Sequence, residues 1–440
     1  MKRFACRVTL FLLALLLPVC ALGEDVVLRV AGLSDTRFFD EFAREHPGVT
    51  VSYVDEHHWS ASSLISALTL RDATYDVMLL DTSNIDIAEV LDKGFALPMT
   101  GSEILNSFAA SLYPALQDMV MRDDVICAAP VYLFCLEGGY NPIAFESLGL
   151  DLPTTYGELA EMINRWPDQP ADVLDEYEIN MWTLNYRKWF LKMVLNGYMT
   201  HMEATGQELH FDTPLFRELM GLVDNLTTAN DVEEERDVNC LMDTASDTLQ
   251  QGYAWNCPLL DLAMDGRVIH TAYARLAIIN PNTEHPEEAL RFVERLVMNT
   301  DDRVRQTMVD AACMTPVEDP EYPQRLSDWE RERAALETKL AESDEADRPD
   351  VEQELARHER QLEWIENARW IISEESIPAF AQVFETLYFP KPDVLGKEDE
   401  TGNAVSVTLQ RRYLEGQLDM EQFIREMESK TQMLLQERGK

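Results

Sequence analysis

Polar and aromatic side chains gather in three short segments, each of which follows an apolar, β-branched run. Ser34 and Asp35 follow the first run, Trp59 follows the second, and Asp81 and Thr82 follow the third. An indole ring packs against the apolar face of a small molecule, while carboxylate and hydroxyl groups hydrogen-bond its polar edge. These residue types therefore favour the reversible binding of a small polar solute.

The sequence lacks the motifs of the common enzyme classes. It has no Gly-x-x-x-x-Gly-Lys-Ser/Thr phosphate loop, no Gly-x-Gly-x-x-Gly turn and no Gly-x-Ser-x-Gly elbow. Two adjacent histidines, His57 and His58, have no HExxH motif or second histidine cluster beside them, so a metal site is not indicated. We expect a binding protein rather than an enzyme, with no metal and no cofactor.

The 440 residues include 37 Lys and Arg against 79 Asp and Glu, which gives a formal net charge of −42. With 46% apolar residues, the chain is long enough for two or three folded domains. An acidic surface repels the phosphates of nucleic acids and anionic lipid headgroups. Nucleic acid is therefore excluded as a partner, and a neutral or cationic ligand is favoured.

The N-terminal segment is typical of an export signal. A basic start precedes the apolar run Val8–Leu17, and Ala21–Gly23 has the small-x-small form of a cleavage site. We interpret residues 1–23 as a signal peptide and expect an extracytoplasmic protein, either periplasmic or cell-surface or secreted. Lipid attachment at Cys20 is an alternative, which Val19 disfavours because the residue before a lipidated cysteine is small.

Two hydrophobic periodicities alternate after the signal. Strands are expected at Val26–Ala31, Val49–Val54, Tyr75–Leu80 and Val125–Phe134, and helices at Thr36–Glu45 and Ser60–Leu70. Strands separated by helices predict βαβ units, an α/β fold class and a mostly parallel sheet. Ligands bind beyond the carboxyl ends of such strands, which is where the candidate residues lie.

Residues 318–372 have a different pattern. Apolar residues recur three, four or seven positions apart in two series, and Arg348-Pro349-Asp350 separates them. This spacing predicts an antiparallel helical hairpin. Two packed surface helices are the simpler interpretation, and a dedicated partner site is the alternative.

Several stretches, taken in order, resemble the extracellular solute-binding proteins of ABC importers, in the group of the maltose-type sugar-binding proteins. The stretches that carry the resemblance are Phe39–Val51, Tyr75–Val77, Cys127–Pro130, Tyr140-Asn141, Leu148–Leu159, Asn280–Phe292 and Gly416–Phe423. They span most of the mature chain. The hairpin has no counterpart in the smaller members of that family.

The resemblance implies a two-lobe architecture of the periplasmic-binding-protein type II kind, with a hinge and with the helical hairpin as an insertion. Carried onto this chain, the first lobe comprises residues 24–134 and 276–317. The second comprises residues 135–275 and 318–440, including the hairpin insertion 318–372. Two cores joined by thin crossings can rotate as rigid bodies, and a ligand that contacts both lobes favours the closed state.

The resemblance also implies a ligand site between the lobes. Beside Ser34, Asp35, Trp59, Asp81 and Thr82, the candidates at the hinge and in the second lobe are Tyr132, Trp182, Tyr186, Tyr253 and Trp255. Trp182, Tyr186 and Trp189 recur at helical spacing, so a place in the core is the competing interpretation for them.

We therefore expect capture of a small solute by lobe closure and its delivery to an ABC permease. A sugar or oligosaccharide is the favoured ligand, and a polyamine also suits the acidity. The alternatives are a secreted interaction or scaffold protein that uses the hairpin, and a secreted glycoside hydrolase, which needs only two facing carboxylates.

Overall fold

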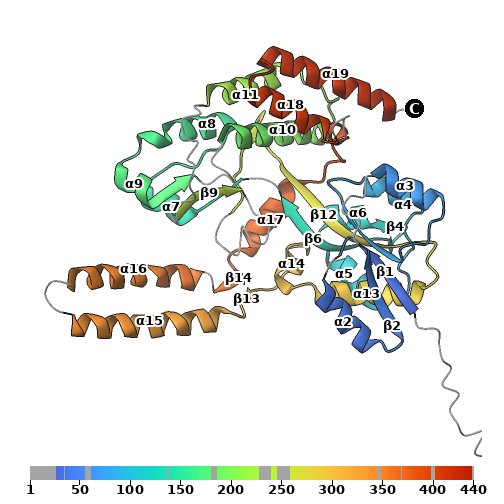
Figure 1. Cartoon of the computed structure of the whole chain (residues 1–440), viewed down its shortest axis with the longest axis horizontal. Coiled ribbons are helices and arrows are strands. Elements are labelled where there is room, and N and C mark those ends of the chain that lie inside the picture. The colour runs from blue at the N-terminus through green and yellow to red at the C-terminus, as the bar shows by residue number, and fades with distance from the viewer. Residues whose placement is uncertain are drawn as a thin grey trace, which may run out of the picture.

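The computed structural model describes residues 26–33, 35–54, 61–135, 138–179, 186–226, 239–244, 258–343, 348–367, 369–397 and 402–438. It shows two α/β lobes, strands that cross between them, and a pair of long helices that projects outward (Figure 1). None of the described helices combines the length and the apolar character needed to cross a membrane.

The first lobe forms around a sheet whose described strands follow the order β15-β12-β3-β1-β2, with β6 paired to β12. The strands are β1 (Val26–Ala31), β2 (Val49–Val54), β3 (Val77–Asp81), β6 (Ala129–Cys135), β12 (His270–Ile279) and β15 (Leu387–Tyr388). β1, β2 and β3 are parallel, as strands joined by helices should be. The α/β fold class is confirmed.

Helices with apolar faces cover this sheet. They are α2 (Thr36–Glu45), α3 (Ala61–Thr69), α4 (Ile87–Asp92), α5 (Glu103–Ser111), α6 (Pro114–Val120), α13 (Pro286–Asn299) and α14 (Asp302–Gln306), with the short pair β4 (Met121–Arg122) and β5 (Val125–Ile126). Phe38 and Phe42 of α2 both contact Phe292 of α13 edge-on, at ring-centroid distances of 5.3 and 5.2 Å. These rings close the core of the first lobe on that side.

The second lobe packs its helices around a small sheet of order β7-β9-β8. Its elements are β7 (Gly138–Tyr140), α7 (Pro142–Leu148), α8 (Tyr156–Arg165), η1 (Trp166–Asp168), α9 (Ala171–Glu176), β8 (Tyr177–Ile179), α10 (Tyr186–Ala204), α11 (Pro214–Asn225), β9 (Asn239–Thr244), β10 (Ala263–Met264), β11 (Arg267–Val268), η2 (Val394–Gly396), α18 (Val405–Leu414) and α19 (Met420–Arg438). The central helix α10 is buried on several sides.

The lobes are joined by crossing strands. β6 leaves the first lobe and continues into β7, whereas β12 returns in the opposite direction beside it (Figure 1). β15 runs parallel to the start of β12, with His270 opposite Leu387 and Thr271 opposite Tyr388. The chain then continues into α18 and α19, so a third crossing lies against the second.

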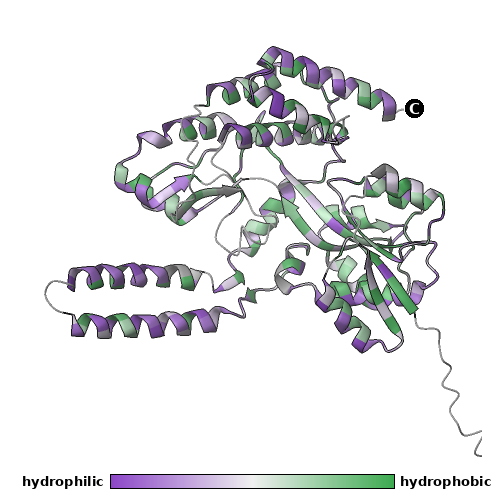
Figure 2. Ribbon diagram, in the orientation of Figure 1, coloured by the Kyte–Doolittle hydropathy of each residue, from purple (hydrophilic) through white to green (hydrophobic). Residues whose placement is uncertain are grey.

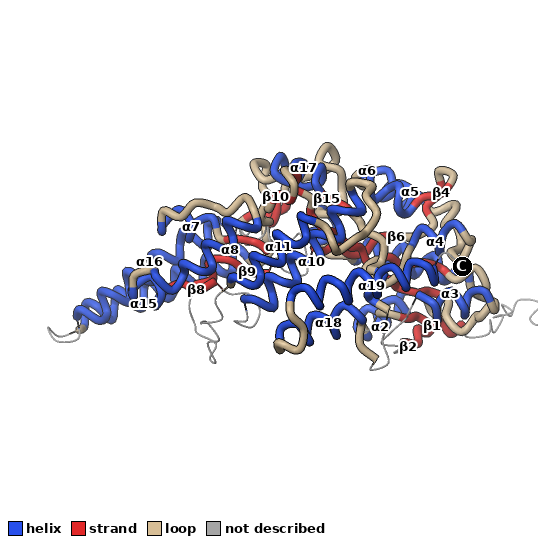
Figure 3. The backbone as a smooth tube through the Cα atoms, turned by 90° about the horizontal axis from the view of Figure 1, so that it is seen from above, coloured by secondary structure: helices blue, strands red, loops and turns tan. Residues whose placement is uncertain are grey.

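The predicted helical hairpin is present and projects from the body as an arm, in two perpendicular views (Figures 1 and 3). We define the arm as α15 (Tyr322–Glu342) and α16 (Arg348–Asn367). Its two helices face each other across Trp329 and His358. The Trp329 indole donates to the His358 carbonyl at 2.9 Å, the His358 ring shares a 3.0 Å hydrogen bond with the Trp329 carbonyl, and the rings stack. Hydrophilic residues dominate the rest of the arm (Figure 2).

A small apolar cluster connects the root of the arm to the body. β13 (Val317–Glu318) and β14 (Trp370–Ile372) pair at this root, and Ile371 and Ile372 pack with Phe380 of α17 (Ile377–Thr386). Val383 of α17 and Leu387 belong to the core of the first lobe, although the sequence assigned residues 318–440 to the second. The division into lobes stays a prediction, which the separate cores of the two lobes support.

Candidate ligand-binding site

The crossing strands bring several side chains together on one face of the sheet, between the lobes. In the pairing of β12 with its neighbours, Arg275 lies opposite Asp81 of β3 on one side and opposite Tyr132 of β6 on the other. Tyr273 lies opposite Phe134. Directly opposite residues, and residues two apart in one strand, point to the same face of a sheet. We call these five residues the hinge face.

Alternation along the crossing strands separates the hinge face from the core. Leu133 and Ala274, which lie between the hinge-face residues in sequence, are fully buried in the core of the first lobe. Tyr132 and Tyr273 are half-buried, and the Arg275 side chain is 48% exposed. The polar and aromatic groups therefore line the side of the ribbon that is turned away from that core.

Three rings form the apolar part of the hinge face. The Phe134 ring lies 5.5 Å from the Tyr273 ring and 6.0 Å from the Tyr132 ring, measured between centroids. The Arg275 guanidinium lies 5.9 Å from the centroid of the Tyr132 ring. Guanidinium groups are attracted to the negative face of an aromatic ring, so Tyr132 helps to hold Arg275 in place.

Two charged groups form the polar part of the hinge face. A carboxylate oxygen of Asp81 lies 3.9 Å from an Arg275 guanidinium nitrogen, which is beyond hydrogen-bond distance. The other carboxylate oxygen accepts hydrogen bonds from the Ser83 backbone N–H at 2.9 Å and from the Ser83 hydroxyl at 2.6 Å. Rings beside groups that donate and accept hydrogen bonds suit a polar molecule with apolar faces.

Asp35 and Thr82, both predicted as ligand contacts, have hydrogen-bond partners within the protein. Asp35 caps α2, and its carboxylate accepts from the backbone N–H groups of Arg37 and Phe38 at 3.1 Å. The Thr82 side chain is 5% exposed, and its hydroxyl accepts from the Ala274 backbone N–H at 2.8 Å. In this structure the Thr82 hydroxyl therefore extends the pairing between β3 and β12.

Tyr186 was also predicted as a ligand contact, and the structure places it in the core of the second lobe with Trp189. The helical spacing that favoured a core position explains this, because α10 begins at Tyr186 and turns its apolar residues inward. Of the predicted residues, the hinge face contains Asp81 and Tyr132. Five predicted contacts lie outside the described residues: Ser34, Trp59, Trp182, Tyr253 and Trp255.

Sequence reasoning missed Arg275, Tyr273 and Phe134. One local signal was available, because Tyr273 and Arg275 alternate with small alanines in a strand whose other face is buried. That alternation shows that both side chains share a face. It does not show which strands lie opposite, and that pairing is what brings Asp81 and Tyr132 to Arg275.

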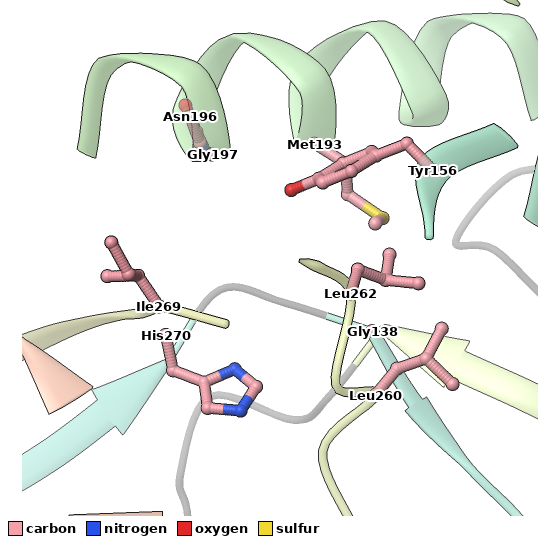
Figure 4. Close-up of a pocket in the computed structure, with 9 residues that line it drawn as sticks. All are labelled: Gly138, Tyr156, Met193, Asn196, Gly197, Leu260, Leu262, Ile269 and His270. Atoms are coloured by element: carbon pink, nitrogen blue, oxygen red, sulfur yellow. The ribbon is translucent and has the colours of Figure 1, made fainter. Parts of the chain in front are cut away.

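A small cavity lies behind the crossing strands, in the second lobe. It measures about 20 Å³, and α10 provides one wall while His270, at the start of β12, lines the opposite side (Figure 4). His270 is buried and shares a 3.0 Å hydrogen bond with Asp261. A volume of this size holds about one water molecule, so the cavity is too small for a sugar.

Metal-binding chemistry finds no support in the described part of the chain. No group of three or more His, Cys, Asp or Glu residues there is arranged to hold a metal ion. Of the described cysteines, Cys127 and Cys135 are buried, Cys240 is half-buried and Cys313 is exposed.

Residues 30–297 match the family model of bacterial extracellular solute-binding proteins. The chain belongs to this family, whose members are binding proteins that act outside the cytoplasm. The resemblance seen in the sequence is thereby confirmed. No curated protein matches the chain.

Solved structures show the same two-lobe fold. An ABC-transporter solute-binding protein from Agrobacterium vitis S4 with bound D-mannitol has 14% sequence identity and a TM-score of 0.52, over 94% of this chain and 99% of that one. Maltose-bound MalE3 of T. maritima has 14% identity and a TM-score of 0.51, over 93% of this chain and 100% of that one. The cyclic α-maltosyl-1,6-maltose binding protein of Arthrobacter globiformis has the same identity and TM-score, over 93% and 99%.

Proposed function

We propose that this protein captures a small neutral solute, a sugar or a polyol, on the hinge face and delivers it to an ABC permease. The observation that carries the proposal is the row Asp81–Arg275–Tyr132, extended by two further aromatic rings, on strands that cross between the lobes. The family membership supports binding and transport, and the ligands of the structural relatives are sugars and a polyol.

The mechanism follows from the position of the hinge face. The rings cover the apolar face of a pyranose or an extended polyol, while the guanidinium donates and the carboxylate accepts hydrogen bonds from hydroxyls. A ligand that contacts both lobes stabilises their closed arrangement by its extra contacts in that state. The closed form then docks on the permease, and no covalent chemistry is involved.

A polyamine is not part of the proposal. An aromatic box with two or more carboxylates would favour such a ligand, whereas the hinge face contains one carboxylate with a guanidinium beside it. That guanidinium repels a cation at close range.

The arm gives little support to a role as an interaction or scaffold protein. That interpretation calls for an exposed apolar stripe on the hairpin. Instead, Trp329, Val351 and Ile365 are buried, and ion pairs such as Lys339–Glu354 at 2.7 Å join the two helices. Export through residues 1–23 and lipid anchoring at Cys20 stay predictions, since both lie outside the described residues.

A thermal-shift screen tests the proposal with D-glucose, D-mannitol, maltose, spermidine and amino acids. A ligand at about 100 times its dissociation constant adds about 2.7 kcal/mol to the apparent free energy of unfolding. We expect a shift with a sugar or polyol, and its loss in Tyr132→Ala. Binding of spermidine alone would contradict the proposal.

Tyr322→Ala is a matched control for that screen. Tyr322 also lies beneath a guanidinium, that of Arg369 at 5.6 Å, but at the root of the arm. The control variant should keep the full ligand-induced shift. If both variants lose the ligand-induced shift equally, the loss comes from a general destabilisation of the protein and not from the hinge face.

A further inference from the structure

The two charges of the hinge face form an ion pair without a direct hydrogen bond between them. The 3.9 Å between Asp81 and Arg275 exceeds the 2.7–2.9 Å of a charge-assisted hydrogen bond. Ser83 explains why the gap does not close, because its backbone N–H and its hydroxyl both bind the other oxygen of Asp81 and fix the carboxylate. On the opposite side, the ring of Tyr132 lies beneath the guanidinium.

Such a gap discriminates between functional groups. A hydroxyl both accepts and donates, so one hydroxyl accepts from the guanidinium and donates to the carboxylate at the same time. An ammonium group only donates, so it can bind Asp81 but is repelled by Arg275 beside it. A ligand carboxylate only accepts, so it can bind Arg275 but is repelled by Asp81.

We propose that the open Asp81–Arg275 pair makes the site selective for uncharged ligands that bear hydroxyl groups. It rejects sugar acids and amino sugars, because a ligand with one charge pairs with one of these two residues and leaves the other unpaired. This inference rests on the proposed function and names the ligand chemistry of the same site. Asp81 and Arg275 are specificity-determining residues, and Ser83 is a positioning residue.

The test removes one charge at a time from the full chain. Asp81→Asn keeps the shape of the side chain and an oxygen for Ser83, while Arg275→Met keeps the apolar stem. Calorimetric titration gives affinities for three neutral probes, D-glucose, D-mannitol and maltose, and for two charged probes, D-glucuronate and D-glucosamine. Circular dichroism establishes that each variant is folded.

The expected result is a change of preference in opposite directions. Relative to the neutral probe that binds best, D-glucuronate should gain about tenfold in affinity in Asp81→Asn, because the repelling carboxylate is gone. D-glucosamine should gain similarly in Arg275→Met. Ser83→Ala should weaken neutral binding severalfold, since the released carboxylate can close onto Arg275.

Arg369→Met is the matched control. Arg369 also lies over a tyrosine and pairs with a carboxylate, that of Glu318 at 2.8 Å, but far from the hinge face in sequence and at the arm root. It should leave all preferences unchanged. If Asp81→Asn and Arg275→Met bind the neutral probes and keep the wild-type preference for them over the charged probes, this inference is overturned and the proposed function is not. Wild-type protein that binds no neutral probe would overturn the proposed function as well.

Discussion

Replacing Thr82 with valine separates a structural role from a ligand-binding one. The Thr82 hydroxyl accepts from the backbone N–H of Ala274 at 2.8 Å, and the Thr82 N–H donates to the Ala274 carbonyl at 3.0 Å. Valine has nearly the same shape but no oxygen. It therefore leaves the Ala274 N–H buried without a partner and keeps the other bond.

The expected cost follows from that single lost acceptor. A buried donor left unsatisfied costs about 1–3 kcal/mol, so Thr82→Val should lower the free energy of unfolding by that amount. Urea denaturation followed by circular dichroism measures it. Thr74→Val is the control, because Thr74 is exposed and its hydroxyl donates to the exposed Asp72. We expect a change within about 0.5 kcal/mol there.

Ligand affinity completes the test of Thr82. Because the hydroxyl is occupied by Ala274, folded Thr82→Val should bind the neutral ligand within about twofold of wild type. A tenfold loss of affinity with unchanged stability would refute this reasoning and return Thr82 to the ligand site.

Three further predictions concern the second lobe and the arm. Gly197→Ala should destabilise the protein by about 1–3 kcal/mol in urea, because an added Cβ would overlap the Tyr156 hydroxyl; an unchanged midpoint would contradict this packing. Burial lowers the pKa of His201, whose ring nitrogens have no partner among the described residues. Below a pH of about 6.5 the unfolded chain binds a proton that the folded chain does not, so acidification should lower the melting temperature more in wild type than in His201→Leu; parallel pH curves would refute it. Trp329→Ala should lower the free energy of unfolding of the arm by about 3–5 kcal/mol, since it removes the indole that packs on His358. Limited proteolysis should then cut the arm while the lobes stay intact. An arm as resistant to the protease as that of wild type would contradict this.

Local patterns in the sequence predicted local structure well. β1, β2 and α2 occupy the predicted residues, because each has a clear periodicity with a break at Pro47-Gly48 between α2 and β2. The start of α8 has a similarly local cause, a capping box: the Thr155 hydroxyl accepts from the Glu158 N–H at 3.2 Å, and Glu158 reaches back to Thr154. The predicted strand Val125–Phe134 is two strands, since a uniform apolar run does not show where its pairing partner changes.

The candidate site was only partly predictable for the same reason. Asp81 could be proposed from sequence because a polar residue at the end of an apolar strand is visible locally. Arg275 lies almost two hundred residues away in sequence, and it joins Asp81 only through the register of β12 against β3. Asp35 shows how ambiguous such a local signal is, because its place before a helix is equally explained by capping, which the structure shows.

Small-angle X-ray scattering with and without the neutral ligand tests the central proposal most directly. If the two lobes close over a solute held on the hinge face, saturation with that solute should reduce the radius of gyration of wild type, and the reduction should disappear in Tyr132→Ala. A radius of gyration that stays the same while calorimetry shows the solute bound would contradict capture by lobe closure.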